Sequence, residues 1–368
     1  MDSSQKRRVR SGPTPELPLS DDRSGWARHL GVSRAAVDLV VDSEVVDLHV
    51  DSFIWARLFG YDLLKRHGQG PLGARWMSQA DLPRLRQAGV GSAVWIITTN
   101  PWRRRRNRLR ALVANYRRLL DTLCHPESGT EVVTNYREYL AARATGKHAA
   151  FIGLQGANAL SDAASPSAFP LEQLLLVTLV HLTNSDIGTT SSPLHLGRDR
   201  GLLTRGRALI QELEAQGTLV DLAHASPRLF WDVVAMHAPA RPLIVSHTGL
   251  SGVTPHWRNL DDRQLRAIAE SGGVAGLLFH GPFLGDPHWG GSVRSVARHL
   301  VHGIKTVGAQ HLCLGSDWDG LIATPLDMPT CLELPCLVQA LLDEGIDEVS
   351  IEWILGKSVL RLLALARP

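Results

Sequence analysis

Two residues with metal-binding side chains lie within one short apolar run. Residues 45–51 read Val-Val-Asp-Leu-His-Val-Asp, so His49 and Asp51 are separated by a single residue. Residues two positions apart in a strand project to the same face. An imidazole and a carboxylate side by side at a strand end can supply two metal ligands, provided that other strands supply the rest. The alternative is a hydrogen-bonded His–Asp pair that closes the end of a barrel.

Similar polar residues follow other apolar runs, which we predict to be strands at 92–99, 149–155, 176–183, 218–224, 242–247, 274–280 and 311–317. Several of these runs end in or beside residues that can bind a metal or move a proton: Gln155, His181, Asp221, His224, Ser246, His247, Asp317 and Asp319. A random scatter of the 16 histidines would not place four of them at strand ends. We therefore expect a cluster, and the alternative for each histidine is a hydrogen-bonded core position.

The elements that carry these residues alternate between strand and helix. Amphipathic segments at 204–216, 227–236, 261–270 and 292–307 separate the apolar runs of the second half. This alternation predicts parallel strands covered by helices. About eight such units predict a closed (β/α)8 barrel, the TIM barrel of the α/β class, in which all strand ends of one kind meet at one mouth. We assign residues 1–40 to an N-terminal tail and short leading helix, and residues 41–368 to one barrel domain.

Composition excludes several classes of protein. The chain has 368 residues, 44% hydrophobic and 20% charged, with a net charge of +3 that is too small to indicate a nucleic-acid partner. The segment Met1–Thr14 is basic and lacks the apolar core of a secretory signal, and no apolar run is long enough to cross a bilayer. We therefore expect a cytoplasmic protein with no membrane partner. Its four cysteines are too few for a disulfide framework.

Taken together, the motifs resemble those of the membrane (renal-type) dipeptidases, zinc metallopeptidases of the amidohydrolase superfamily. The resemblance runs from about Val45 to Leu363. It is carried by His49-Val-Asp51, Phe151–Gly156, Thr178–Asn184, the 201–220 helix, Asp221-Leu-Ala-His224, Ser246-His247, His256-Trp-Arg-Asn259 and Gly315–Gly320. Each motif is weak alone, but their order is specific.

The resemblance implies a zinc centre. The family's equivalents of His49 and Asp51 hold one ion, those of His224 and His247 hold the other, and residue 155 bridges the two. Metal binding lowers the pKa of a shared water, which attacks the peptide carbonyl. The alternative for His224 and His247 is a structural role in the core.

The resemblance also implies roles for three residues around the metals. His181 would contact the substrate and donate to the developing oxyanion, with a purely structural role as its alternative. Arg258 would bind the terminal carboxylate of the substrate, or else be a surface arginine. Asp317 would orient or deprotonate the water and pass the proton to the leaving amine, or else cap a helix. Asp319 is expected to hydrogen-bond the turn after the last strand.

One residue departs from the family pattern. The family has a bridging glutamate where this chain has Gln155, and a carboxamide offers one neutral oxygen instead of two anionic ones. Two dications roughly 3.5–4 Å apart repel each other by an energy on the order of ten kcal/mol or more, even at an effective dielectric near 20. Three outcomes are open: a weakened pair held by hydroxide, a single catalytic zinc, or a metal-free barrel that only binds.

The leading hypothesis is a zinc-dependent hydrolase that cleaves the amide of a small dipeptide or N-acyl amino acid, using one or two ions. The alternative is a pseudoenzyme or binding barrel whose metal site is impaired by Gln155. Family members often dimerise, so a homodimer is compatible with the resemblance. The arginine-rich segment from Trp102 to about Leu120, which contains Arg103–Arg106, is expected to be a solvated barrel helix. Its alternative, a nucleic-acid surface, lacks an accompanying motif.

Overall fold

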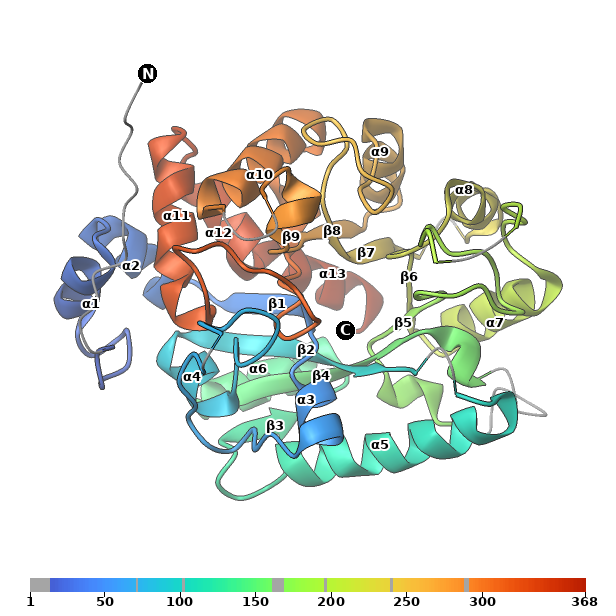
Figure 1. The fold of residues 1–368 in the computed structure, drawn as a ribbon, viewed down its shortest axis with the longest axis horizontal. Helices are drawn as coiled ribbons and strands as arrows, with labels where there is room; N and C mark the ends of the chain where they lie inside the picture. The colour runs from blue at the N-terminus through green and yellow to red at the C-terminus, as the bar shows by residue number, and fades with distance from the viewer. Residues whose placement is uncertain are drawn as a thin grey trace.

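A closed barrel of eight parallel strands forms the centre of the protein (Figure 1). The structure is a computed structural model that describes residues 14–70, 72–100, 103–160, 169–194, 197–238, 241–287 and 291–368. Around the barrel the strands follow the order β1 (Val45–Val50), β2 (Val90–Thr98), β4 (His148–Gln155), β5 (Leu176–Thr178), β6 (Leu219–Asp221), β7 (Leu243–Thr248), β8 (Val274–Leu277) and β9 (Leu312–Leu314). The last strand returns to pair with β1, which confirms the predicted (β/α)8 barrel.

A ninth strand, β3 (Thr130–Val132), was not predicted. It pairs with the first half of β4, at residues 148–150, whereas β5 pairs with the second half, at residues 153–155. The two strands therefore share one edge of β4. A three-residue strand is too short to produce a recognisable alternation in the sequence.

Helices surround the barrel on its outside (Figure 1). They are α3 (Phe53–Phe59), α4 (Leu82–Gln87), α5 (Arg108–Leu123), α6 (Tyr136–Ala144), α7 (Thr204–Ala215), α8 (Pro227–Met236), α9 (Asp262–Glu270), α10 (Val293–Val307), α11 (Leu334–Asp343), α12 (Glu348–Glu352) and α13 (Ser358–Ala366). Their starts follow local chemistry. Ser226 caps α8 ahead of a first-turn proline, and Asp261 and Gln264 form a capping box on α9.

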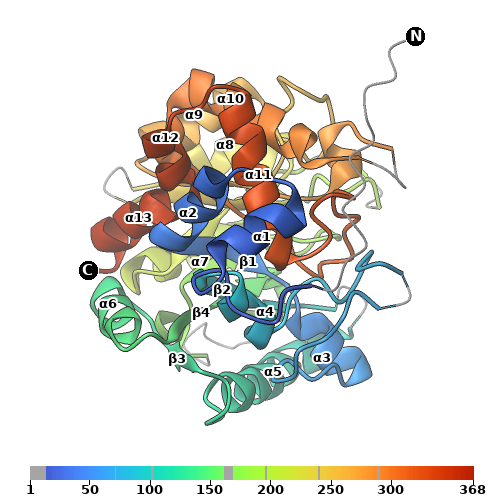
Figure 2. The ribbon, with the colours of Figure 1, turned by 90° about the vertical axis from the view of Figure 1, so that its left-hand side faces the viewer.

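Two further helices, α1 (Arg23–Leu30) and α2 (Arg34–Asp42), precede the first strand. They lie beside α11, as Figure 2 shows. Trp26, Val37 and Val40 are buried in the same apolar cluster as residues of the barrel helices, so the leading segment packs onto the barrel. Residues 1–13, most of the predicted tail, lie outside the described residues.

Several strands are shorter than predicted. The runs predicted at 176–183, 218–224 and 311–317 form strands only at 176–178, 219–221 and 312–314. His224 and Asp317, three residues beyond the ends of their strands, have positive φ angles of 63° and 62°, a left-handed conformation that is incompatible with a continued strand. His181, His224 and Asp317 therefore lie in the loops after their strands, where polar side chains can face the mouth.

Apolar side chains fill the barrel below the mouth. Val46, Leu48, Phe151 and Ile244 belong to one buried cluster with residues of the C-terminal helix α13. After α13, Arg367 donates hydrogen bonds to the carbonyls of Gly217, Glu172 and Leu174, in the segments that lead into β6 and β5. The C-terminal helix thus closes the end of the barrel opposite the site. None of the helices in the described ranges combines the length and apolar composition needed to cross a bilayer.

Candidate active site

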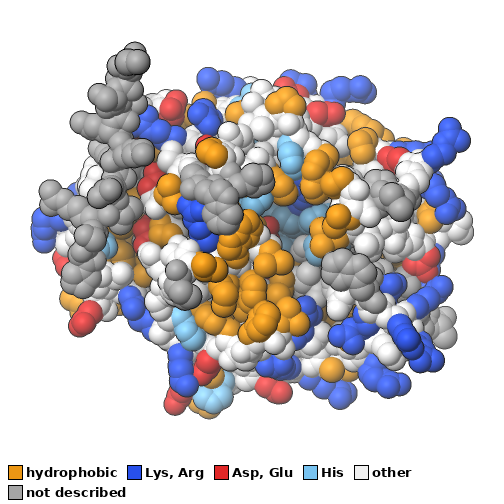
Figure 3. Space-filling view, in the orientation of Figure 1, with side chains coloured by type: hydrophobic (Ala, Val, Ile, Leu, Met, Phe, Trp, Pro, Cys, Tyr) orange, Lys and Arg blue, Asp and Glu red, His pale blue; other side chains and the backbone are white. Residues whose placement is uncertain are grey.

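Four histidines gather at the C-terminal ends of the strands, where Figure 3 shows a hollow with histidine side chains inside it. The ring centroids of His49 and His247 are 3.8 Å apart, those of His247 and His224 are 5.0 Å apart, and those of His224 and His181 are 4.7 Å apart. These four predicted site residues therefore meet, although they come from segments far apart in the chain.

Ser246 holds two of the histidines at once. Its Oγ lies 3.1 Å from Nδ1 of His49 and 2.9 Å from Nδ1 of His247, and it donates a 2.7 Å hydrogen bond to Oδ2 of Asp221. A serine hydroxyl has one proton, so it must accept from both rings. Both histidines therefore carry their proton on Nδ1, and their Nε2 lone pairs face the hollow. This is the tautomer that a metal ligand needs.

Asp221 is fixed in turn by its neighbours. Its carboxylate accepts hydrogen bonds from Thr178 Oγ1 at 2.5 Å and from the backbone N–H groups of Ala223 and Ser246 at 3.0 and 2.8 Å. The backbone of Ser246, which donates to Asp221, is also closely packed. A Cβ added to Gly276 or Gly315 would lie 2.1 or 2.0 Å from the Ser246 carbonyl oxygen, so only glycine allows this close approach.

The first pair of residues predicted as ligands is also brought together. Asp51 Oδ2 lies 3.6 Å from His49 Nε2, and its Oδ1 accepts a hydrogen bond from Thr98 Oγ1. Both side chains are buried. Gln155, also buried, places Oε1 3.1 Å from the same His49 nitrogen. The residue at the bridging position thus points at the first pair.

Asp317 approaches the same histidine from the other side, with Oδ1 3.9 Å from His49 Nε2. Burial raises the pKa of Asp317 to about 8, and Asp51 adds to the rise, whereas His49 and Arg258 oppose it. Asp317, Asp319 and His224 all have positive φ angles at the mouth, a costly conformation that is concentrated at functional sites in proteins. A helix-capping role, the alternative for Asp317, is not seen in any described helix.

The other side of the hollow is less tightly bonded. His224 Nε2 lies 3.0 Å from His247 Nε2, but within the described residues Nδ1 of His224 and Nδ1 of His181 have no hydrogen-bond partner. Burial lowers the pKa of His181 to about 4 and that of His224 well below its usual value, so both rings are neutral at pH 7. Neutral rings with free nitrogens can accept a ligand.

Arg258 lies beside these rings and is buried, which contradicts its alternative as a surface arginine. Its Nη2 donates a 2.8 Å hydrogen bond to the His247 carbonyl. Burial lowers its pKa to about 10, whereas Asp317 and Asp221 oppose this effect. The guanidinium therefore stays charged at neutral pH and places a positive charge next to the cluster.

The donor set fits a metal ion. One ligand atom each from His49, His247 and Asp317 lie within 4.8 Å of one another. The 3.0 Å between the Nε2 atoms of His224 and His247 is close to the roughly 3.3 Å expected between two tetrahedral zinc ligands. Imidazole nitrogens with fixed lone pairs and carboxylate oxygens are the ligand types that zinc prefers. The unpartnered buried nitrogens support the same interpretation.

The hydrogen-bond partners of Asp319 differ from those expected. It contacts the loop before α4 and not the turn after the last strand: Oδ1 accepts from Gln79 N at 2.9 Å, and Oδ2 accepts from Ala80 N at 3.1 Å and from Ser52 Oγ. It is therefore structural, as expected, but it ties the loop after β9 to the loops after β1. Sequence reasoning did not assign roles to Ser246, Asp221 or Thr98. Only the first two gave a signal, because each lies within three residues of a predicted ligand.

The arginines of the arginine-rich segment contact different parts of the chain. Arg105 forms a 3.3 Å ion pair with Asp186, and Arg118 donates to the carbonyls of Ala56 and Arg57 at the end of α3. The helix begins at Arg108 and not at the predicted Trp102, which lies outside the described residues. The helix α5 is thus a partly exposed barrel helix, as expected.

The fold and the site define a (β/α)8 barrel with a cluster of histidines and carboxylates, able to hold a metal ion, at its C-terminal mouth. Residues 33–367 match the family described as membrane dipeptidase, peptidase family M19. The chain therefore belongs to this family, as the sequence motifs indicated.

Curated relatives include the dipeptidase tcpJ of Claviceps purpurea, which is 32% identical over 225 residues, 60% of this chain and 51% of the relative. A Klebsiella pneumoniae protein named "uncharacterized protein in pqqA 5'region" is 34% identical over 44% of this chain and 60% of its own length. The matches thus span about half to three fifths of these two relatives. The dipeptidase aclJ of Aspergillus oryzae is 24% identical over 87% of this chain and 77% of its own length.

Solved structures share the fold. A structure described as dipeptidase AC, a metallopeptidase of family M19, has a TM-score of 0.78 at 25% identity and covers 88% of this chain and 99% of its own. An amidohydrolase from Pseudomonas aeruginosa has a TM-score of 0.73 at 21% identity and covers 90% and 99%. The barrel is therefore that of the M19 peptidases and related amidohydrolases.

Proposed function

We propose that the protein is a zinc-dependent dipeptidase that cleaves the amide of a small dipeptide or related N-acyl amino acid. The observation that carries the proposal is the meeting of His49, His247 and Asp317, with ligand atoms within 4.8 Å of one another, at the barrel mouth. Membership of the membrane dipeptidase family and the relatives named dipeptidases support the reaction class. The fixed tautomers of His49 and His247 support metal binding, and a ligand set of imidazoles and carboxylates is typical of zinc.

The predicted ligands would hold the metal. They are His49, Asp51, His224 and His247, with Gln155 beside them. Zinc bound there would polarise the peptide carbonyl and lower the pKa of a water molecule.

Three further residues would act on the substrate. His181 would donate a hydrogen bond to the carbonyl oxygen as negative charge develops there. Arg258 would bind the terminal carboxylate, for which a buried guanidinium is suited. Asp317 would take a proton from the attacking water and return it to the leaving amine. The positive charges of a bound zinc and of Arg258 would favour the anionic form that this role needs, against the burial that raises the pKa of Asp317.

Gln155 sets the metal content within this proposal. A neutral carboxamide cannot offset the repulsion between two dications as a bridging carboxylate does. We therefore expect about one firmly bound zinc per chain, with the second ion weakened.

The variant Gln155→Glu tests this expectation directly. It should raise the zinc content toward about two per chain and increase dipeptide hydrolysis at least about tenfold, because it restores the bridging charge. Elemental analysis of protein purified without chelator and a steady-state dipeptide screen with added zinc provide the two measurements. Gln173→Glu is the matched control, because it adds the same charge at an exposed position. An unchanged zinc content and rate in Gln155→Glu would remove residue 155 from the mechanism.

A second candidate function is favoured by the contact between Gln155 and His49. The two ends of an amide are exchanged by rotation of the side chain, so its amino group can face His49 Nε2 at the 3.1 Å separation. It would then donate to the lone pair that a metal needs, and the barrel would bind a ligand without hydrolysing it. Absence of zinc after supplementation, with no turnover of any dipeptide, would support this candidate and contradict the dipeptidase.

A further inference from the structure

A second hollow lies beside the candidate metal site, on the outer side of the end of β2. It is small and open to solvent, and it lies between β2, α3 and α5. Its lining includes Arg57, Arg103 and Arg108, together with Ile97, Thr98 and Leu112. The lining therefore combines apolar and uncharged polar side chains with three arginines, and among the described residues it contains no acidic one.

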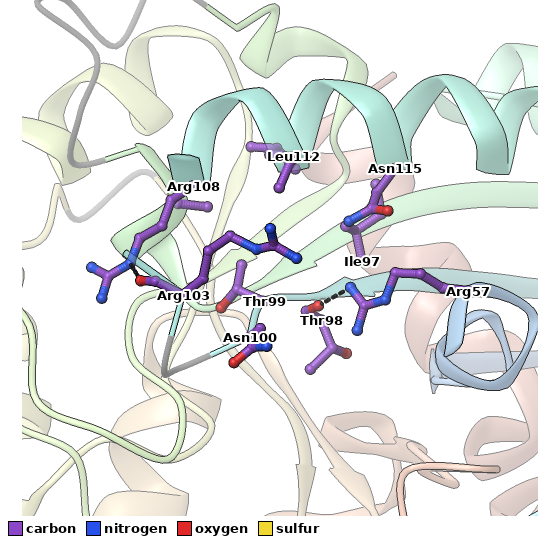
Figure 4. A pocket seen from close by; sticks show the side chains of 11 residues that line it. Arg57, Ile97, Thr98, Thr99, Asn100, Arg103, Arg108, Leu112 and Asn115 are labelled. Carbon is purple, nitrogen blue, oxygen red and sulfur yellow. Dashed lines mark hydrogen bonds between the residues drawn. The ribbon is translucent and has the colours of Figure 1, made fainter. Parts of the chain in front are cut away.

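The guanidinium groups of two arginines point into the same space. Figure 4 shows Arg57 reaching in from α3 and Arg103 from the segment before α5, with both guanidinium groups near Thr98, whereas that of Arg108 points away. Arg57 donates one hydrogen bond, from Nη1 to the Thr98 carbonyl at 2.6 Å, and this fixes its position. Among the described residues, no carboxylate forms an ion pair with either arginine.

The charge of Asp51 opposes the positive charge of the hollow only in part. Burial lowers the pKa of Arg57, and the charges of Arg103 and Arg118 lower it further, whereas Asp51 opposes them. The first turn of α5, which carries Arg108, contains no acidic residue, and Asn107 does not cap it with its side chain. The positive end of a helix dipole therefore adds to the arginine charges. Converging guanidinium groups that lack a carboxylate favour an anion with several oxygens.

The hollow and the candidate metal site share a wall. Thr98 lines the hollow and accepts the hydrogen bond of Arg57 at its carbonyl, whereas its hydroxyl donates a hydrogen bond to Asp51. A group held by Arg57 and Arg103 would therefore be separated from the predicted ligand Asp51 by Thr98 alone. We propose that this hollow binds an oxyanion, a carboxylate or phosphate group, next to the reaction centre. This proposal rests on the proposed function, because it takes the oxyanion to be the acidic side chain of a dipeptide substrate. The alternative source of the oxyanion is a free phosphate ion.

The variant Arg103→Gln tests the site, because Arg103 is exposed and its removal should leave the fold intact. Arg110→Gln is the matched control: it removes the same charge from an exposed position of α5 that does not line the hollow. The first measurement is the calorimetric titration of inorganic phosphate into the full-length, zinc-supplemented protein. We expect Arg103→Gln to weaken phosphate binding about tenfold or more, since a charged bidentate contact is lost, and Arg110→Gln to leave it unchanged.

The second measurement compares kcat/KM for Ala-Glu and Ala-Gln, which differ in charge but hardly in shape. For a substrate-borne carboxylate, the wild type prefers Ala-Glu and Arg103→Gln lowers this preference about tenfold, whereas Arg110→Gln preserves it. If only phosphate binding weakens, the oxyanion is a free anion.

If Arg103→Gln changes neither quantity more than Arg110→Gln does, the proposal is overturned. A wild type that hydrolyses no dipeptide contradicts the proposed function instead, and the phosphate titration still decides whether the hollow binds an oxyanion.

Discussion

Two pairs of histidines share the mouth of the barrel, and they are supported differently. His49 and His247 both donate Nδ1–H to the hydroxyl of Ser246, which Asp221 holds from below. His224 and His181 have no partner on Nδ1 among the described residues. The tautomer and orientation of the first pair are thus fixed by the protein alone. In the second pair, each ring has one nitrogen without a hydrogen-bond partner among the described residues.

The difference indicates how the site divides its work. The fixed pair sits on β1 and β7, within the hydrogen-bonded barrel, so its lone pairs are aimed before anything binds. The open pair lies in the loops after β5 and β6, where a shift of backbone is less costly. We infer that the fixed pair provides affinity for the metal, and that the open pair adapts to the substrate or to a second ion.

The largest expected effect comes from His247, the residue that touches both pairs. His247→Ala should lower kcat/KM for a dipeptide by roughly a thousandfold, because the lost polarisation by the metal is worth several kcal/mol. Zinc content and initial rates provide the measurement, with His125→Ala as an exposed control. Unchanged zinc content in His247→Ala would remove this residue from the metal site and break the comparison.

A smaller effect is expected from the residue behind the fixed pair. Ser246→Ala keeps all four rings but removes the acceptor of both Nδ1–H groups, so zinc affinity should fall about 10- to 100-fold. Competition with a chelator measures the affinity, and nitrogen NMR of the imidazoles reports the tautomers directly. Ser92→Ala is the matched control, since its buried hydroxyl contacts only the Ala149 carbonyl. If both imidazoles of Ser246→Ala still carry their proton on Nδ1 alone, the serine does not select the tautomer.

The smallest effect concerns a histidine at the other end of the barrel. His148 Nδ1 lies 2.9 Å from the Val90 carbonyl, and its Nε2 accepts from Trp95 Nε1 at 3.3 Å, so the neutral ring is satisfied on both sides. Burial lowers its pKa to about 4. Unfolded imidazole binds a proton near pH 6.5, so the unfolded state takes up more protons between these values. This stabilisation is full above pH 6.5 and is lost as the pH falls toward 4.

His148→Gln should therefore reduce the pH dependence of the free energy of unfolding by up to about 1.4 kcal/mol per pH unit in this window. Denaturant unfolding at several pH values between 4 and 7.5, with wild type and variant in the same buffers, measures the slope. Parallel slopes for the two proteins would show that the ring is not the group responsible.

Much of this architecture could be predicted, because buried parallel strands leave a strong signal. The alternation of apolar runs and amphipathic helices predicted the barrel, and the residues after those runs predicted which side chains would meet. His49, His224 and His247 could be named because their types are uncommon at strand ends. The ligand roles assigned to them are part of the proposed function.

The remaining features depend on contacts between segments distant in sequence. Ser246 reaches two rings that belong to different strands, and Thr98 supports an aspartate that lies 47 positions earlier. The strand ends at His224 and Asp317 were misplaced, because a left-handed residue other than glycine has no clear sequence signature. The Arg57–Arg103 hollow was hidden for the same reason, since only the fold brings α3 next to the start of α5.

The two glycines that flank Ser246 carry a consequence for how this site can evolve or be redesigned. Gly276 and Gly315 press against the serine carbonyl so closely that even a methyl group would force β7 outward. A harmless-looking alanine at either position would thus misalign both imidazoles without contacting the substrate. New specificities must therefore arise in the loops that surround the opening, while the bottom of the cavity tolerates no added bulk.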